Sequence, residues 1–385
     1  MSNKKRTVLF ISERRADYSR LKPIMKAVQK STKLNLKLVV TGTHLLKNFG
    51  ETKRVVEKDG FWIDAKVPMF KPRGADDGAA MVEAMARVLG GLPKVYKKLK
   101  PDIVFCGFDL GAHLAAAITA MHMNIHVAHI QGGERSGTID EVLRHACTKF
   151  SHIHFVATEK SRKRVIKLGE DSKYVYNVGS PSLDTIKSIS YPSKKIIFKK
   201  YHLDPEKKLI IFLQHPVTTE VDEVVVQIHQ TIDAVHTVNR KYGTQALAIY
   251  SNNDAGGKRI VAYLKKSGIA VLPHVVYEDF LRLLKHASVL VGNSSTGIHE
   301  APSFGLPTVN VGTRQQFRER GKNVIDTPNN KGKILQAIEK SLFDKKYIKM
   351  VESGSNPYDN GDTAKQVVHI LESETLPSIQ KVITY

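Results

Sequence analysis

Short, largely apolar segments alternate with longer segments of helical periodicity throughout the first half of the chain. The apolar segments are residues 7–11, 36–40, 103–106, 126–130 and 154–157. Residues 19–29 and 81–98 lie between them and have the spacing of helices. Because the apolar residues do not alternate with polar ones, both faces of each strand are expected to be covered, as in a parallel sheet. The pattern predicts a doubly wound α/β domain.

The same alternation returns in the second half of the chain. Strands are predicted at residues 209–213, 245–250, 270–272, 289–291 and 308–311. A turn-rich stretch from Val178 to Ser182 separates the two halves. We therefore expect two Rossmann-like domains, residues 1–177 and 178–362, and a C-terminal helical segment, residues 363–385, that packs back on the first domain. The domains would face each other across a cleft, with ligands bound at the carboxyl ends of the strands.

The composition of the 385-residue chain excludes several classes of protein. An apolar content of 42% is too high for a disordered chain, and two cysteines cannot form a disulfide scaffold. No apolar run approaches the roughly 20 residues of a membrane span, and the N-terminal run is too short for a signal peptide. We expect a cytoplasmic protein. The net charge of +22 raises the possibility of nucleic-acid binding, but no basic stripe is interleaved with aromatic residues, so we expect no nucleic-acid partner.

A small polar turn follows the strand predicted at residues 289–291. Ser294 and Ser295 there combine hydroxyls and free backbone N–H groups with a helix start, which suits a phosphate or diphosphate; plain N-capping is the alternative. Glu300 could accept ribose hydroxyls or simply interact with the helix dipole. Arg314 follows the next predicted strand and could offset diphosphate charge in the same cleft.

A second polar cluster is predicted on the first domain, where a glycine-rich stretch containing Glu134 and Asp140 follows a buried strand. At helical spacing Asp140 would neighbour Arg144. Asp109 ends another predicted strand, and His215 has the matching position in the second domain. The alternatives are a solvated loop, a turn residue and a structural histidine. The sequence contains no metal-ligand spacing and no Gly-x-Gly-x-x-Gly or P-loop pattern.

Several motifs occur together in a fixed order. They are the stretches at residues 15–19, 123–125, 132–140, 214–219, 254–256, 292–295 and 312–314. In this set the chain resembles the UDP-N-acetylglucosamine 2-epimerase family, and most of all its hydrolysing, sialic-acid-pathway branch. The resemblance covers most of the chain. It implies a glycosyltransferase-B-like fold, a UDP-sugar as the partner, a homo-oligomer (dimer or tetramer), and neither a metal nor another cofactor.

The resemblance also implies roles for individual residues. UDP would bind mainly to the second domain, with Arg15 and Ser19 approaching it from the first. The implied substrate-binding residues are Arg15, Ser19, Asp254, Ser294, Ser295, Glu300 and Arg314. The implied catalytic residues are Asp109, Asp140, His215, Gln131 and Glu134. Which carboxylate removes the C2 proton is left open.

The implied reaction is hydrolytic epimerisation of UDP-N-acetylglucosamine. UDP is eliminated across C1–C2, and water adds to the resulting enol ether to release N-acetylmannosamine for sialic-acid-type synthesis. Such a reaction needs stabilisation of the departing diphosphate and of positive character at C1, together with groups that move the C2 proton.

Two positions depart from the pattern of the family. Gln131 stands where better-known members carry a catalytic Glu, and a carboxamide cannot accept a proton. Leu110 stands where they carry Arg, which removes one cation. These departures keep open a related sugar, such as a 2,4-diacetamido-trideoxyhexose on UDP or GDP. A non-hydrolysing epimerase and a glycosyltransferase on the same fold are further alternatives.

Overall fold

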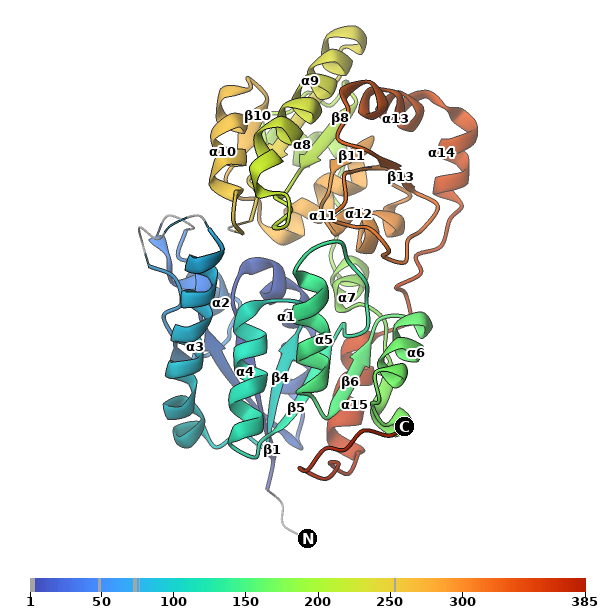
Figure 1. Cartoon of the computed structure of the whole chain (residues 1–385). Coiled ribbons are helices and arrows are strands. Elements are labelled where there is room, and N and C mark those ends of the chain that lie inside the picture. The colour runs from blue at the N-terminus through green and yellow to red at the C-terminus, as the bar shows by residue number, and fades with distance from the viewer. Residues whose placement is uncertain (1–3, 48–49, 72–74, 76, 253) are drawn as a thin grey trace.

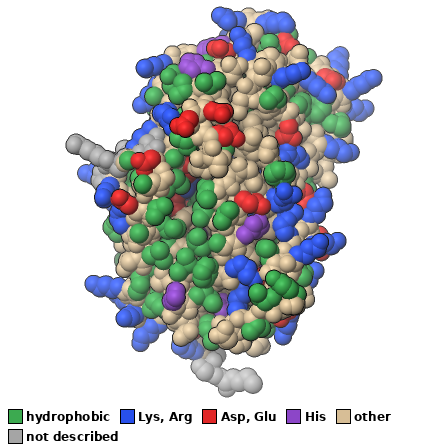
Figure 2. Space-filling view, viewed as in Figure 1, with side chains coloured by type: hydrophobic (Ala, Val, Ile, Leu, Met, Phe, Trp, Pro, Cys, Tyr) green, Lys and Arg blue, Asp and Glu red, His purple; other side chains and the backbone are tan. Residues whose placement is uncertain are grey.

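A computed structural model describes residues 4–47, 50–71, 75, 77–252 and 254–385. It consists of two lobes, each built around one parallel β-sheet (Figure 1). No helix in these described ranges is long and apolar enough to cross a membrane. Figure 2 shows Lys and Arg side chains scattered over both lobes on the face in view, without a continuous basic stripe.

The first sheet is parallel in every pairing and has the order β3-β2-β1-β4-β5-β6-β7. Its strands are β1 (Arg6–Ser12), β2 (Leu34–Val40), β3 (Ala65–Lys66), β4 (Ile103–Gly107), β5 (His126–Ile130), β6 (Ile153–Val156) and β7 (Val175–Asn177). The helices of this region are α1 (Arg15–Lys30), α2 (Lys53–Lys58), α3 (Gly78–Leu99), α4 (Gly111–His122), α5 (Asp140–Lys149), α6 (Glu159–Lys167) and α7 (Pro181–Ser188). The strand order reverses between β1 and β4, and such switch points open a crevice at the strand ends.

The second sheet is also parallel, with the order β10-β9-β8-β11-β12-β13. Its strands are β8 (Leu209–Leu213), β9 (Gln245–Ile249), β10 (Ala270–Leu272), β11 (Val289–Gly292), β12 (Thr308–Val311) and β13 (Val324–Thr327). The helices around it are α8 (Lys194–Lys200), α9 (Val224–Tyr242), α10 (Gly257–Lys266), α11 (Tyr277–His286), α12 (Thr296–His299), α13 (Lys331–Phe343) and α14 (Lys345–Glu352). The switch point lies between β8 and β11.

Each sheet is covered on both faces, which explains why its strands are apolar without alternation. In the first lobe one hydrophobic cluster contains α1, and the other contains α3 and α4. In the second lobe α9 and α13 belong to one cluster and α11 to the other. All strands predicted from the sequence are present. The short strands β3, β7 and β13 were not predicted, because the first has two residues and the others mix polar with apolar side chains.

The C-terminal helix α15 (Thr363–Ser373) returns to the first lobe (Figure 1). Its Val367 and Leu371 are buried in the cluster that contains α1. Helix α7 contacts α1 and α15, whereas its Leu183 and Ile186 belong to a cluster of the second lobe. The chain between residues 177 and 188 therefore packs on both lobes, and the division after residue 177 remains a proposal.

The two lobes touch directly where Gly137 meets the loop after β12. The backbone N–H of Gly137 donates to the carbonyl of Arg314 at 3.0 Å. A Cβ at Gly137 would lie only 2.0 Å from the carbonyl oxygen of Thr313, so this approach requires glycine. The contact fixes the acidic start of α5 opposite Arg314.

Candidate active site

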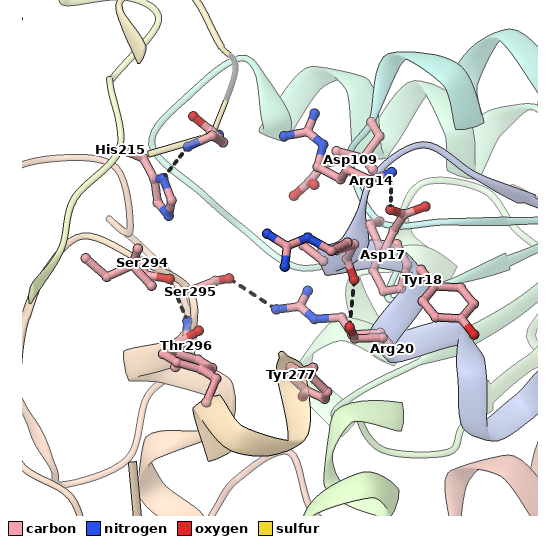
Figure 3. A pocket seen from close by; sticks show the side chains of 18 of the residues that line it. Arg14, Asp17, Tyr18, Arg20, Asp109, His215, Tyr277, Ser294, Ser295 and Thr296 are labelled. Atoms are coloured by element: carbon pink, nitrogen blue, oxygen red, sulfur yellow. Dashed lines mark hydrogen bonds between the residues drawn. The ribbon is translucent and has the colours of Figure 1, made fainter. Parts of the chain in front are cut away.

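A cavity of about 320 Å³ lies between the lobes, at the carboxyl ends of both sheets (Figure 3). Most of the residues predicted for the site line it. They are Arg15, Ser19, Asp109, Asp140, His215, Asp254, Ser294, Ser295, Glu300 and Arg314. No group of three or more His, Cys, Asp or Glu side chains in the described part of the chain is arranged to hold a metal ion.

The second-lobe wall of the cavity begins where β11 ends. Gly292 has a φ of +129°, and a Cβ there would lie 2.1 Å from the Leu213 carbonyl, so the chain can pass this close to β8 only with glycine. Ser294 then accepts a hydrogen bond from the Thr296 N–H at 3.3 Å. Glu300 is buried, and its Oε2 has no hydrogen-bond partner among the described residues. This wall offers hydroxyls and one open carboxylate oxygen to a ligand.

Helix α1 supplies cations from the opposite wall. Arg20 donates to the Ser295 hydroxyl at 3.2 Å and lies 3.6 Å from a Glu300 oxygen (Figure 3). Arg15 donates to His274, whereas the Ser19 hydroxyl donates to the Arg15 carbonyl within its own helix. Cations from the first lobe therefore reach the two groups expected to hold the diphosphate and the ribose.

Two cations of this wall were not predicted from the sequence: Arg20, and Arg14, which lies 3.6 Å from Asp254. The helix was predicted to begin at residue 19, but it begins at Arg15. With the earlier start, Arg15, Ser19 and Lys22 have the spacing i, i+4, i+7 of a single helix face. Neither Arg14, which precedes the helix, nor Arg20 belongs to that face, so helical spacing did not indicate these two cations.

Asp109 lies just beyond β4 and is held by cations from both lobes. Arg144 of α5 donates to its Oδ2, and Arg318 of the second lobe lies 3.5 Å from the same oxygen. Burial would raise the pKa of Asp109, but these guanidinium groups outweigh it and lower the pKa to about 2. Asp109 is therefore ionised near neutral pH. Arg144 pairs with Asp109 rather than with Asp140, the neighbour expected from helical spacing.

Asp140 begins α5 and has the opposite electrostatic environment. Burial and the charge of Asp109 raise its pKa to about 6, although Arg314 opposes the shift from 3.4 Å away. Two carboxyl groups in one cavity thus differ by several pKa units. Such a pair separates an electrostatic role from a proton-transfer role.

His215 follows β8 and is held in one tautomer. Its Nδ1 accepts a hydrogen bond from the backbone N–H of Asn252 at 3.1 Å. Burial and the charges of Arg314 and Arg14 lower the pKa of His215 well below its usual value, so the ring is neutral. Because Nδ1 is an acceptor, the proton resides on Nε2. His215 lines the cavity together with Ser294 and Ser295 (Figure 3).

Gln131 and Glu134 do not line this cavity, contrary to the expectation from the sequence. Both are buried, and the Gln131 amide donates to Glu134 at 2.9 Å. Glu134 in turn lies 3.0 Å from both His299 and Arg318. Burial would raise the pKa of Glu134, but His299 and Arg318 outweigh it and hold the pKa well below its usual range. Arg318 links this buried network to Asp109.

Two Rossmann-like domains with a shared cavity at their strand ends form a glycosyltransferase-B-like α/β fold, as predicted. The solved structure of UDP-GlcNAc 2-epimerase from Neisseria meningitidis bound to UDP-GlcNAc matches this fold with a TM-score of 0.81 and 20% sequence identity. The match covers 95% of this chain and 99% of that chain.

Sequence comparison gives the family. Residues 26–372 match the profile described as UDP-N-acetylglucosamine 2-epimerase, and the chain belongs to this family. The UDP-N,N'-diacetylbacillosamine 2-epimerase (hydrolyzing) of Legionella pneumophila is 36% identical, over 97% of both chains. The UDP-N-acetylglucosamine 2-epimerase of Neisseria meningitidis serogroup B is 34% identical, over 92% of this chain and 91% of the relative.

Proposed function

We propose that the protein is a hydrolysing 2-epimerase of a UDP-linked 2-acetamido sugar. The observation that carries the proposal is the pair Asp109 and Asp140, whose pKa values of about 2 and about 6 differ within one cavity. The same cavity contains Ser294 and Ser295, which are suited to the diphosphate. Membership of the epimerase family supports the reaction class.

In the proposed elimination, the C2–H bond and the C1–O bond both break. Asp140 accepts the C2 proton, because a carboxylate whose pKa lies near the working pH is the better proton-transfer group. The C1–O electron pair leaves with UDP, and the C2–H pair forms the C1=C2 double bond. Asp109 stays ionised and stabilises positive character at C1.

His215, Arg20 of α1 and Arg314 of the second lobe assist the departing diphosphate in this mechanism. The Nε2–H of neutral His215 donates a hydrogen bond to it, and Arg20 and Arg314 offset its charge. Water then adds its oxygen to C1, and a proton returns to C2 on the opposite face. The products are UDP and the C2-inverted free sugar. Gln131 and Glu134 act by orienting Arg318 against Asp109.

Two sugars fit this mechanism. UDP-N-acetylglucosamine, which would give N-acetylmannosamine, is the substrate that the sequence resemblance implies. The apolar part of the cavity favours N,N'-diacetylbacillosamine on UDP. Leu110 lies there with Met81, Ile139 and Leu143, and a methyl group at C6 is better accommodated by such a wall than a hydroxyl. The Legionella relative supports the same choice.

The test is an NMR time course in deuterated water with UDP-N-acetylglucosamine, UDP-N,N'-diacetylbacillosamine and the corresponding GDP-sugars. We expect free UDP and a C2-deuterated, C2-inverted sugar from the diacetamido substrate at the highest kcat/KM. A C2-inverted product that retains UDP would instead identify a non-hydrolysing epimerase. Intact substrates in the absence of an acceptor would indicate a transferase and contradict the proposal.

We also propose a cytoplasmic homo-oligomer, dimer or tetramer. Support comes from exposed valines on the first lobe: Val82 on α3 and Val142 on α5 are 64% and 62% exposed. Figure 2 shows other hydrophobic side chains gathered on this lobe. Multi-angle light scattering of the purified chain tests the proposal, and a mass of one chain, 43.0 kDa, would contradict it.

A further inference from the structure

A second cavity, of about 350 Å³, lies between the lobes on the other side of Glu134 and Arg318. Helix α6 and Arg135 line it from the first lobe, and residues 317–320 line it from the second. Of the residues that line this cavity, the mechanism proposed above uses only Glu134 and Arg318. Its walls are built mainly of charged side chains, which is unusual for a space that merely separates two domains.

Positive charge exceeds negative charge around this second cavity. Five Lys or Arg side chains line it, against two carboxylates. Lys160 lies 3.4 Å from Glu319, and Arg318 lies 3.0 Å from Glu134, so these cations have acidic partners.

Two guanidinium groups have no acidic partner within ion-pair distance among the described residues. Arg135 lies over the ring of Phe317, 4.3 Å from its centroid. The Arg164 guanidinium donates to the Gly133 carbonyl. Burial and the charge of Arg135 lower the pKa of Arg164, so the two groups repel each other. An anion between them would relieve this repulsion.

Two buried atoms of the cavity's lining residues are also without partners in the described part of the chain. One is the Nε of Arg318, whose side chain is only 5% exposed, and the other is Oε2 of Glu319. A buried donor or acceptor that lacks a partner costs about 1–3 kcal/mol. The first atom requires an acceptor and the second a donor. One ligand with an anionic group and a hydroxyl would satisfy both.

We propose that this second cavity binds a small hydroxylated anion, distinct from the UDP-sugar. Its phosphate or carboxylate group lies between Arg135 and Arg164 and accepts from the Arg318 Nε–H. Its hydroxyl donates to Glu319. Both lobes supply contacts to this ligand. The ligand therefore binds when the two lobes have the same relative position that forms the main cavity.

Isothermal titration of the full chain, saturated with UDP to occupy the main cavity, tests this proposal. The probes are glucose 6-phosphate, gluconate and inorganic phosphate. We expect saturable binding of glucose 6-phosphate or gluconate, and the stronger of the two identifies the anionic group. Inorganic phosphate, which lacks the carbon-bound hydroxyls, is expected to bind at least threefold more weakly.

The double variant Arg135→Gln with Arg164→Gln is expected to lose at least tenfold in affinity for the hydroxylated probe. Lys163→Gln is the matched control, since Lys163 is an exposed cation of α6 that does not line the cavity. UDP affinity should stay unchanged in all three proteins, which verifies folding. Two results would overturn the proposal. One is a probe affinity in the double variant equal to that of the wild-type chain. The other is no saturation of the wild-type chain when the probe is at millimolar concentration and in 20-fold molar excess over the protein. Neither result bears on the epimerase reaction, which is measured separately.

Discussion

Burial and the negative charge of Asp109 raise the pKa of Asp140, and both carboxyl groups line the interlobe cavity. Asp109 keeps its charge because Arg144 and Arg318 contact it, whereas Asp140 faces only Arg314 as an ion-pair partner among the described residues. The two carboxyl groups are therefore prepared for different tasks before any substrate binds.

Replacing Asp109 by Asn should abolish most turnover but preserve UDP binding. The variant loses the charge that stabilises positive character at C1, and an effect of about 100-fold or more on kcat is expected. Asp109 does not belong to the Ser294–Ser295 wall, so the Kd for UDP should change less than about threefold. UDP release and calorimetry measure the two quantities. A variant with normal kcat and weakened UDP binding would contradict the assignment.

The value of kcat/KM should fall as the pH decreases through about 6, because Asp140 must be ionised to accept the C2 proton. Asp254→Asn removes a negative charge that raises this pKa, so the acid limb should move to lower pH. Arg314→Gln removes a positive charge that lowers it, so the limb should move to higher pH. Steady-state rates from pH 4.5 to 8 check the direction in each variant. An acid limb that stays in place in both would exclude Asp140 as its origin.

The double variant Ser294→Ala with Ser295→Ala should weaken UDP binding by about tenfold or more, since two hydrogen bonds of about 1 kcal/mol each are lost. Ser193→Ala is the control, because Ser193 is exposed and its side chain makes no capping bond. Calorimetric titration with UDP distinguishes the two proteins. Unchanged affinity in the double variant would mean that the diphosphate binds elsewhere.

Leu110→Arg should shift the sugar preference. The substitution places a cation in the apolar part of the cavity. Better-known members of the family carry Arg at this position. We expect the ratio of kcat/KM for UDP-N,N'-diacetylbacillosamine over UDP-N-acetylglucosamine to fall by about tenfold, as expected for about 1.4 kcal/mol of differential binding. Leu110→Met keeps the wall apolar and should preserve the ratio. The same ratio in both variants would show that Leu110 does not determine the sugar preference.

Arg318→Leu should destabilise the chain by about 3–5 kcal/mol, because Glu134 would remain buried without its guanidinium partner. The pKa of Glu134 is held low in the folded protein, so this stabilisation is present above the unfolded pKa and declines as the pH falls. The loss should therefore be smaller at pH 4 than at pH 7. Urea unfolding at both pH values measures it.

Two companion variants make the Arg318 experiment specific. Adding Glu134→Gln to Arg318→Leu should restore part of the lost stability, since no charge is then left unpaired. Arg54→Leu removes the 3.1 Å pair with Glu51, in which Arg54 is 76% exposed, and should cost less than about 1 kcal/mol. Equal losses in Arg54→Leu and Arg318→Leu would contradict the importance of the buried network.

Local sequence determined most of the fold and one wall of the site. Strands such as β5 and β8 were predicted with their observed bounds, because an apolar run covered on both faces has a recognisable composition. Ser294, Ser295 and Asp109 could be predicted to lie at the cavity because each closely follows a strand, and parallel strands end at one edge of the sheet. The short edge strand β3 could not be predicted, since two residues carry no periodicity.

Only the tertiary structure decided which charged groups meet. Arg318 reaches Asp109 and Glu134 from about half the chain length away, and no spacing rule relates these positions. The same holds for Gln131 and Glu134, which the glycine-rich stretch suggested for the cavity but which the fold buries behind it. Sequence thus determined the strands, the turns and the chemical groups available at their ends. Packing of the two lobes determined the pKa values of Asp109 and Asp140, because these depend on burial and on cations brought from distant segments.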